Sequence, residues 1–424
     1  MATIPTADAG KRIVTLDIIR GIAVMGIFSV NITAFAMIEG AYFNPPAYGG
    51  ADGANLAIWV ANLTLVDGKM RSLFSMLFGA SMLLVIQRAA ANGESPAKVH
   101  FARMAVLFAI GWLHYHLLWW GDILKDYAAV GCLAFLFRAK SVRALMGWAI
   151  GFYLFGMLFF GSYLLQVLEW DHAAHATGAG REVIASWNEF ARMVYPPAAD
   201  IAKDLALHRG PWLGIADYWL VERPFSWLAP LMFFAPETLA LMLFGMAGYK
   251  SGFLTGEWTD RRYKRWAVVG LSLGALASIA LAVADIQSRF YAPLVFGGFI
   301  IGLAPFRLLM AAGYAALIIL LTRNSGWLAR RFAATGRAAF TNYLGTSLIA
   351  AFVFYGWGLG YYGYAERWQA WLLVPAVWAV MLLWSKPWLD RFHYGPLEWL
   401  WRTLSRGKLQ PFRKRPPAAA AAAA

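Results

Sequence analysis

Arg12-Ile-Val-Thr-Leu-Asp-Ile-Ile-Arg-Gly-Ile-Ala-Val-Met-Gly-Ile-Phe-Ser-Val-Asn31 is the first of a series of apolar segments in this chain. Asp17 and Arg20 are three residues apart in it, and the segment is then apolar up to Asn31. Residues three apart share a face of a helix, so Asp17 and Arg20 are predicted to form an ion pair inside the segment. Charges in hydrocarbon are costly unless paired, which makes the pair a functional hypothesis. The alternative is that both side chains anchor the helix end among lipid headgroups.

The composition is that of an integral membrane protein. Of 424 residues, 60% are hydrophobic and only 14% are charged, whereas soluble domains carry about a quarter charged residues. The net charge of +14 is attributed to basic cytoplasmic loops, and nucleic acid is not expected as a partner. A single cysteine, Cys132, excludes an intrachain disulfide and a cysteine-based metal site. The first apolar run is too long for a signal peptide and is read as a retained span.

Segments of about 20 apolar residues, long enough to cross a bilayer, occur roughly ten times. They cover approximately 13–37, 69–88, 101–120, 122–138, 143–168, 230–250, 265–284, 294–322, 338–357 and 368–385. The prediction is an all-α polytopic membrane protein with about ten transmembrane helices. An N-terminal helical bundle (1–168), an extracytoplasmic loop or lid (169–229) and a C-terminal bundle with a tail (230–424) are expected to divide it. Proline near the eighth span predicts a kinked or broken helix there.

Basic residues alternate between the connections, as the positive-inside rule requires. One side carries Lys11, Arg12, Arg88, Lys98, Arg103, Arg138, Lys140, Arg143, Lys250, Arg261, Arg262, Lys264, Arg265, Arg323, Arg330, Arg331, Arg337, Arg402, Arg406, Lys408, Arg413, Lys414 and Arg415. The opposite connections are acidic or mixed. Both termini are therefore predicted to be cytoplasmic. The polar, tryptophan-rich insert after the fifth span is then extracytoplasmic, where it covers a cavity as a partial lid or lies on the membrane surface.

The densest polar group is Gly111-Trp-Leu-His-Tyr-His-Leu-Leu-Trp-Trp-Gly-Asp-Ile-Leu-Lys-Asp126. A histidine near a carboxylate supplies a titratable nitrogen and a group that orients it, so His114 is the candidate general base and Asp122 its partner. His114 and His116 are two residues apart and point to different faces of a helix, which argues against a zinc pair. The alternative is a buried structural histidine. Neither a Walker loop nor an HExxH motif occurs in a suitable context.

Two further groups of polar residues open apolar spans. Lys69 and Arg71 lie at the predicted outer side, against the charge trend. They are expected to bind an anionic headgroup, a carboxylate partner or a polyanionic substrate, or else to extend to lipid phosphates. At the cytoplasmic side, Arg337, Asn342 and Tyr343 open the ninth span. Arg337 suits a phosphate of a donor, whereas threonine and asparagine there also serve hydrogen bonds between helices.

Taken together, these motifs resemble the YeiB-like family of bacterial membrane proteins, which carry the domain of unknown function 418. The matching motifs are Arg12…Leu16-Asp17-x-x-Arg20-Gly21 with Asn31; Asn44-Pro45; Gly68-Lys69-x-Arg71-x-Leu-Phe-Ser-x-Leu-Phe-Gly79; Gly111-x-x-His114…Trp119-x-Gly121-Asp122-Ile-Leu; Gly336-Arg337-x-Ala-x-Thr341-Asn342-Tyr343; and Gly395-Pro396-x-Glu398-Trp399-x-Trp-Arg402. The resemblance implies a location in the bacterial inner membrane.

The family is distantly similar to transmembrane acyltransferases, including glycan O-acetyltransferases and heparan-α-glucosaminide N-acetyltransferase, mainly through Leu-Asp-x-x-Arg-Gly. Where the O-acetyltransferases carry a histidine eleven residues after that arginine, this chain has Asn31. Where the heparan enzyme carries a histidine in its first outer loop, Tyr42-Phe-Asn-Pro-Pro46 has none. His114 is then the histidine that matches the YeiB-like pattern, and His116 lies outside it.

The leading functional hypothesis is a transmembrane acyltransferase. An acyl-CoA-like donor would bind at the cytoplasmic side near Asp17, Arg20 and Arg337. A glycan or lipid acceptor would bind near Lys69, Arg71, His114 and Asp122, in a cavity lined by the first, second, third and ninth spans. Expected partners are membrane lipids and the acceptor, and a homodimer is allowed for. The alternatives are a transporter or flippase for a small anionic or amphipathic molecule, and a scaffold without a substrate.

Overall fold

The computed structural model describes residues 13–324 and 326–414. Within these ranges the regular structure is helical, apart from an isolated β-bridge between Phe392 and Arg413. The helices are α1 (Val14–Ala36), α2 (Gly40–Phe43), η1 (Pro45–Ala47), α3 (Gly53–Leu65), α4 (Lys69–Ala91), α5 (Pro96–Leu117), α6 (Leu124–Ala134), η2 (Phe135–Phe137), α7 (Val142–Ala174), α8 (Arg181–Ala191), α9 (Ala198–Arg209), α10 (Trp212–Asp217), η3 (Tyr218–Glu222), α11 (Leu228–Lys250), α12 (Asp260–Gln287), α13 (Ala292–Gly297), η4 (Gly298–Gly302), α14 (Ala304–Thr322), α15 (Trp327–Arg337), α16 (Ala339–Phe354), α17 (Arg367–Trp371), α18 (Leu373–Arg391) and α19 (Pro396–Arg406). The predicted all-α membrane fold is confirmed.

Helices occupy all ten expected spans, and seven helical segments of the described chain are long and apolar enough to cross a membrane. These are Val14–Ala36, Gly53–Ala91, Val142–Ala174, Leu228–Lys250, Asp260–Gln287, Ala304–Thr322 and Arg367–Arg391. The helices α5, α6 and α16 are not among them. The number of about ten crossings and the cytoplasmic side of the termini therefore stay predictions. Lys11, Arg12 and Arg415, which belong to the basic side in that prediction, lie outside the described residues.

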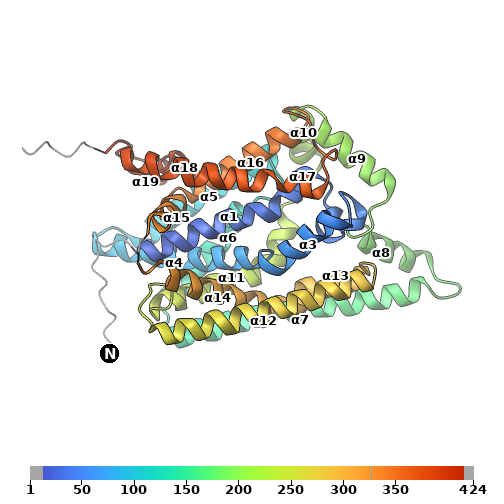
Figure 1. Ribbon diagram of the computed structural model, residues 1–424, viewed down its shortest axis with the longest axis horizontal. Coiled ribbons are helices and arrows are strands. Elements are labelled where there is room, and N and C mark those ends of the chain that lie inside the picture. Colours follow the sequence, from blue (N-terminus) through green and yellow to red (C-terminus); the bar gives the residue numbers. More distant parts are fainter. Residues whose placement is uncertain (1–12, 325, 415–424) are drawn as a thin grey trace, which may run out of the picture.

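Most long helices run side by side along the long axis of the molecule (Figure 1). Helix α1 lies in the middle, with α16 and α18 on one side and α7, α12 and α14 on the other. The insert after α7 forms α8, α9 and α10 at one end of the molecule, whereas α15 and α19 lie toward the opposite end. The eighth expected span is interrupted, as its prolines predict: α13 passes into the π-helix η4 before α14 begins.

Helix α1 is central because nearly all of it is buried and its backbone closely approaches α15. A Cβ atom added at Gly21 would lie 2.2 Å from the carbonyl oxygen of Phe332, and one at Gly336 would lie 1.8 Å from that of Asp17. No side chain fits at either position, since real Cβ atoms do not approach so closely. The glycines of two sequence motifs thus pack against each other.

A second crossing of this kind joins α4 to α11. A Cβ atom at Gly79 would lie 2.1 Å from the carbonyl oxygen of Met242, and one at Gly245 would lie 1.8 Å from that of Met76. Small residues at such crossings allow helix backbones to approach within a membrane. Arg71 and Glu237 each precede the glycine on their own helix by eight residues. The crossing therefore sets the distance between these two charged side chains.

The carboxylate of Glu398 on α19 caps the first turn of α16. It accepts hydrogen bonds from the backbone amides of Phe340 (2.7 Å) and Thr341 (3.1 Å) and from the Thr341 hydroxyl (2.6 Å). These are donors that a helix start leaves without intrahelical partners. Burial raises the pKa of the Glu398 carboxyl, and the hydrogen bonds from Thr341 oppose that shift. The motif around Glu398 thus attaches α19 to α16.

Replacing Gly245 by leucine should push α11 away from α4 and lower the thermal unfolding temperature of the purified protein. Overpacking a close crossing costs about 1–3 kcal/mol or more. Gly151→Leu on α7 is the matched control, because Gly151 is exposed and an added Cβ would meet nothing within 4 Å. Equal unfolding temperatures for the two variants in the same detergent would contradict the close crossing.

Candidate functional site

A cavity of about 370 Å³ lies among the helices. Its walls come from α1, α2, α4, α5, α6, α7, α11, η4 and α14 and from the turns between some of them, so segments from both expected bundles share it. The charged residues that line it are Glu39, Asp67, Arg71, Asp122, Lys125, Asp126, Glu237 and Arg307. A cavity with this many ionisable groups inside a membrane protein is the first candidate for a functional site.

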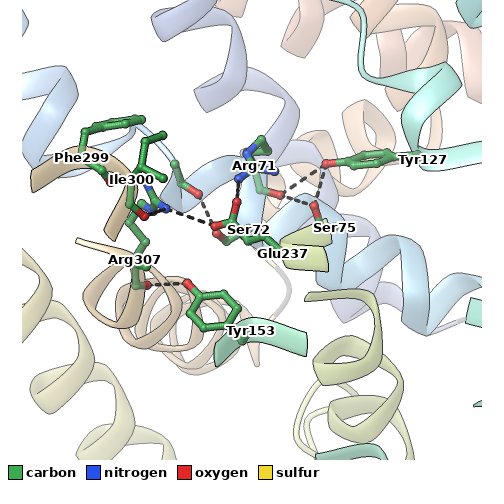
Figure 2. A network of polar contacts seen from close by, with 11 residues as sticks. Arg71, Ser72, Ser75, Tyr127, Tyr153, Glu237, Phe299, Ile300 and Arg307 are labelled. Carbon is green, nitrogen blue, oxygen red and sulfur yellow. Dashed lines mark hydrogen bonds and ion pairs between the residues drawn. The ribbon is translucent and has the colours of Figure 1, made fainter. Parts of the chain in front are cut away.

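Glu237 on α11 lies between two arginines at the cavity wall (Figure 2). One carboxylate oxygen pairs with Arg71 of α4, and the other is 3.2 Å from the Arg307 guanidinium of α14. Arg307 also donates to the carbonyl oxygens of Phe299 (2.7 Å) and Ile300 (3.3 Å) in the π-helix. Its Nε atom is buried and has no hydrogen-bond partner among the described residues. One carboxylate between two guanidinium groups leaves a local charge of +1.

Tyrosines hold the backbone around these charges (Figure 2). The Tyr127 hydroxyl lies 2.8 Å from the Ser75 hydroxyl, and both donate to the carbonyl oxygen of Arg71. On α7, the Tyr153 hydroxyl donates to the carbonyl oxygen of Ala304 at 2.6 Å, in the first turn of α14. Residues of α4, α6, α7 and α14 therefore position the two arginines before any ligand binds.

A histidine–carboxylate pair forms where α5 meets the start of α6. Nδ1 of His114 is 2.8 Å from Oδ1 of Asp122, and both side chains are almost fully buried. Because a carboxylate accepts, Nδ1 is the donor, and in the neutral ring the lone pair lies on Nε2. That Nε2 atom is buried without a hydrogen-bond partner in the described chain. A Cβ at Gly111, one turn before His114, would lie 2.4 Å from the Lys125 amide, so glycine permits this contact.

Lys125 completes the surroundings of Asp122. Its backbone amide donates to Oδ2 of Asp122 (3.1 Å), and its ammonium group donates to the Asp122 carbonyl oxygen (2.8 Å). The same ammonium is 3.3 Å from Asp126 and lies 4.5 Å from the centre of the Tyr115 ring. Asp122 is thus held by two neighbours, which keeps its orientation toward His114.

Two acidic residues, Asp67 and Glu39, also line the cavity. The Tyr42 hydroxyl donates to Asp67 at 2.7 Å, and Glu39 is exposed to the cavity. Burial among protein atoms raises the pKa of the Glu39 carboxyl, the nearby Asp204 raises it further, and Arg223 opposes the shift. Asp67 precedes Gly68, where an added Cβ would lie 2.3 Å from Cδ of Arg307, so Asp67 adjoins the arginines.

The chain is 30% identical to "Uncharacterized protein YxaH" of Bacillus subtilis (strain 168), over 98% of this chain and 99% of that protein. It is 31% identical to "Uncharacterized protein YeiB" of Escherichia coli (strain K12), over 93% of this chain and 96% of that protein. The profile of the family "Protein of unknown function (DUF418)" matches residues 248–408. The chain belongs to the YeiB-like DUF418 family. No solved structure matches it significantly.

In this YeiB-like protein the cavity brings together three of the residues predicted for a site. Asn31, Arg71 and Asp122 line it, and His114 contacts Asp122 from behind the wall. The spans predicted to line it are correct in part, because α1, α4 and α5 contribute side chains and α16 contributes none. The insert between 169 and 229 also contributes no lining residue, although the Ser226 hydroxyl is 3.0 Å from that of Tyr115, which does line the cavity.

The predicted ion pair between Asp17 and Arg20 forms, with 3.1 Å between the charged atoms. Arg20 also donates to the Ser81 hydroxyl (2.5 Å) and to the carbonyl oxygen of Gly336 (3.4 Å). Gly336 directly precedes Arg337 in the chain. The Arg337 guanidinium itself donates to the carbonyl oxygen of His393. Asp17, Arg20 and Arg337 are therefore grouped, but none of them lines the cavity.

The other predicted residues make contacts within the protein. Lys69 is fully buried and donates to the carbonyl oxygen of Leu63, so it does not reach lipid phosphates. The Asn342 amide nitrogen donates hydrogen bonds to the Thr335 carbonyl oxygen (3.0 Å) and the Ser385 hydroxyl. Its amide oxygen accepts a hydrogen bond from the Trp384 indole. Tyr343 is buried, with its ring centre 5.7 Å from that of His114. Asn342 thus joins helices, and Tyr343 packs beside the candidate base.

Six charged residues of the cavity wall were not predicted as site residues: Glu39, Asp67, Lys125, Asp126, Glu237 and Arg307. Of these, Glu237 and Arg307 belong to the charge cluster with Arg71. Each is an ionisable residue inside an apolar span, and each lies next to or near a proline, Pro236 or Pro305. Such residues are expensive in a membrane and usually face a partner or a cavity. That signal was present in the sequence, although the pairing depends on how α4, α11 and α14 pack.

Glu237→Ala should destabilise the protein, because it leaves two arginines in the cavity wall without their carboxylate. Removing one partner of a buried ion pair costs about 3 kcal/mol. In a double-mutant cycle, the loss in unfolding free energy on adding Arg71→Gln to Glu237→Ala should be smaller than on adding it to the wild type. Additive losses would show that Arg71 and Glu237 do not interact.

Proposed function

We propose that this YeiB-like protein is a transmembrane acyltransferase in which His114 is the general base. The observation that carries the proposal is the hydrogen bond between His114 and Asp122, which leaves Nε2 of the histidine buried and unpaired beside the cavity. An imidazole oriented by a carboxylate, with its second nitrogen unpaired, suits proton removal from an acceptor hydroxyl or amine.

In the proposed reaction, an acceptor in the cavity gives its proton to Nε2 of His114 as its oxygen or nitrogen attacks the carbonyl carbon of an acyl thioester. The carbon–sulfur bond then breaks, and the thiolate leaving group takes the proton back from the imidazolium. Asp122 stabilises the imidazolium while it exists. Lys125 and Arg71, which line the same cavity, supply the positive charge near the developing oxyanion.

An acyl-CoA-like donor is proposed to bind where Asp17, Arg20 and Arg337 are grouped. The arginines suit the phosphates of such a donor, because guanidinium groups bind phosphate through paired hydrogen bonds. Arg20 retains partial exposure there, at 22% of its side chain, beside the end of α15. The location in the bacterial inner membrane and the cytoplasmic side of this group are part of the same proposal.

His114→Ala should reduce acyl transfer from radiolabelled acetyl-CoA to the lipids and glycans of the host membrane by about 100-fold or more. The purified protein in lipid vesicles is the sample, and release of free CoA is the second readout. His116→Gln is the matched control: His116 is buried two residues away, its Nδ1 faces the carbonyl oxygen of Trp112, and it does not line the cavity. Wild-type rates in His114→Ala would remove His114 from the reaction.

Transport of a small anionic or amphipathic molecule is the second candidate, and one observation favours it. The π-helix η4 interrupts the span at the cavity, and its carbonyl oxygens bind Arg307 rather than lipid. Broken helices of this kind form ligand sites in transporters. A carrier would show substrate uptake into vesicles that His114→Ala does not abolish, whereas an acyltransferase would not.

A further inference from the structure

The cavity has an arginine side and an apolar side. Arg71 and Arg307 carry two positive charges against the single carboxylate of Glu237, and the Nε atom of Arg307 is buried without a partner in the described chain. Arg307 is only 3% exposed. An anion with several oxygens, such as a phosphate, would match both the excess charge and the unpaired donor.

The apolar side is built from α7 and α11. Met157 and Phe160 of α7 and Leu231 and Phe234 of α11 line it, and the ring centres of Phe160 and Phe234 are 5.9 Å apart. These side chains cannot hydrogen-bond a phosphate, and a small hydrophilic anion would leave them in contact with water. A ligand that fills both sides must carry an anionic group and a hydrocarbon chain.

Part of this wall is also exposed on the protein surface, since Phe234 lines the cavity and is 37% exposed. Every residue of α11 from Thr238 to Gly248 is buried, whereas none from Leu228 to Glu237 is. Phe159 and Phe233 are exposed on the two helices, with their ring centres 5.9 Å apart. Apolar surface that the protein itself does not cover, on a helix expected to cross the bilayer, contacts acyl chains.

We infer that the cavity binds a phospholipid. Its phosphate lies against Arg71 and Arg307, and its acyl chains lie along Phe160 and Phe234. The polar end of its headgroup, a hydroxyl or an amine, lies toward the acceptor groups of Asp126 and Glu39. This inference rests on the proposed function for one step only, in which that hydroxyl or amine is the group acylated near His114.

The test measures binding to purified protein in detergent with three probes. Phosphatidylglycerol has both parts, diacylglycerol lacks the phosphate, and sn-glycerol 3-phosphate lacks the acyl chains. Saturable binding of phosphatidylglycerol, about tenfold or more tighter than either other probe, is the expected result. If sn-glycerol 3-phosphate binds as tightly as phosphatidylglycerol, the cavity is a site for soluble anions. If diacylglycerol binds as tightly as phosphatidylglycerol, the arginines do not contribute to binding of the phosphate. Either result would overturn the inference.

Two variants examine the two sides of the site separately. Arg71→Gln should weaken phosphatidylglycerol binding about tenfold without changing diacylglycerol binding. Gly156→Leu should fill part of the apolar side and weaken phosphatidylglycerol binding about tenfold, because Gly156 lines the cavity and an added Cβ there makes only an ordinary contact, 3.7 Å from Pro236. Gly151→Leu is the control, because Gly151 lies five residues earlier on α7 and an added Cβ there meets nothing within 4 Å. It should bind phosphatidylglycerol as the wild type does.

If Arg71→Gln fails to fold, Gly156→Leu decides the question, and wild-type binding by a folded Gly156→Leu protein overturns the lipid site. Acyl-CoA turnover by the wild type is recorded on the same sample. Phosphatidylglycerol binding without turnover would reject the proposed acyltransferase and keep the lipid site. Turnover without phosphatidylglycerol binding would reject the lipid site and keep the acyltransferase.

Discussion

An ion inside a membrane-spanning bundle is stable only where neighbouring groups replace its water, and Glu237 obtains those groups from Arg71 and Arg307. The two arginines are on different helices, so the interaction requires α4, α11 and α14 to meet. The glycine crossing between α4 and α11 brings the first pair together, and the π-helix before α14 supplies carbonyl oxygens to Arg307.

The pair of His114 and Asp122 also consists of buried polar groups that neighbouring groups stabilise in place of water. Helix α5 ends at Leu117, the chain turns, and Asp122 returns to meet His114, while Gly111 makes room for the turn. Asp122 is fully satisfied by its protein neighbours, whereas Nε2 of His114 is not. An unpaired buried nitrogen is costly, so its retention in the structure points to a ligand that completes it.

Sequence reasoning predicted the helices well, because apolar runs of sufficient length have few other structures available in a membrane. It also predicted the pairing of Asp17 with Arg20 and of His114 with Asp122, since both pairs are close in the chain. It did not predict the partners of Glu237, which lie far along the chain and depend on tertiary packing. Nor can a single sequence tell a polar residue that faces a cavity from one such as Asn342, whose amide joins neighbouring helices.

The central claim is that charged residues of separate helices meet in one cavity that water reaches. Cysteine labelling tests it most directly, in a Cys132→Ser background that removes the chain's own thiol. Asn31→Cys and Phe299→Cys, at two positions that line the cavity, should react with a small water-soluble thiol reagent, whereas Leu83→Cys, which is 1% exposed in the core, should not. Protection of both cavity positions to the level of Leu83→Cys would contradict the account.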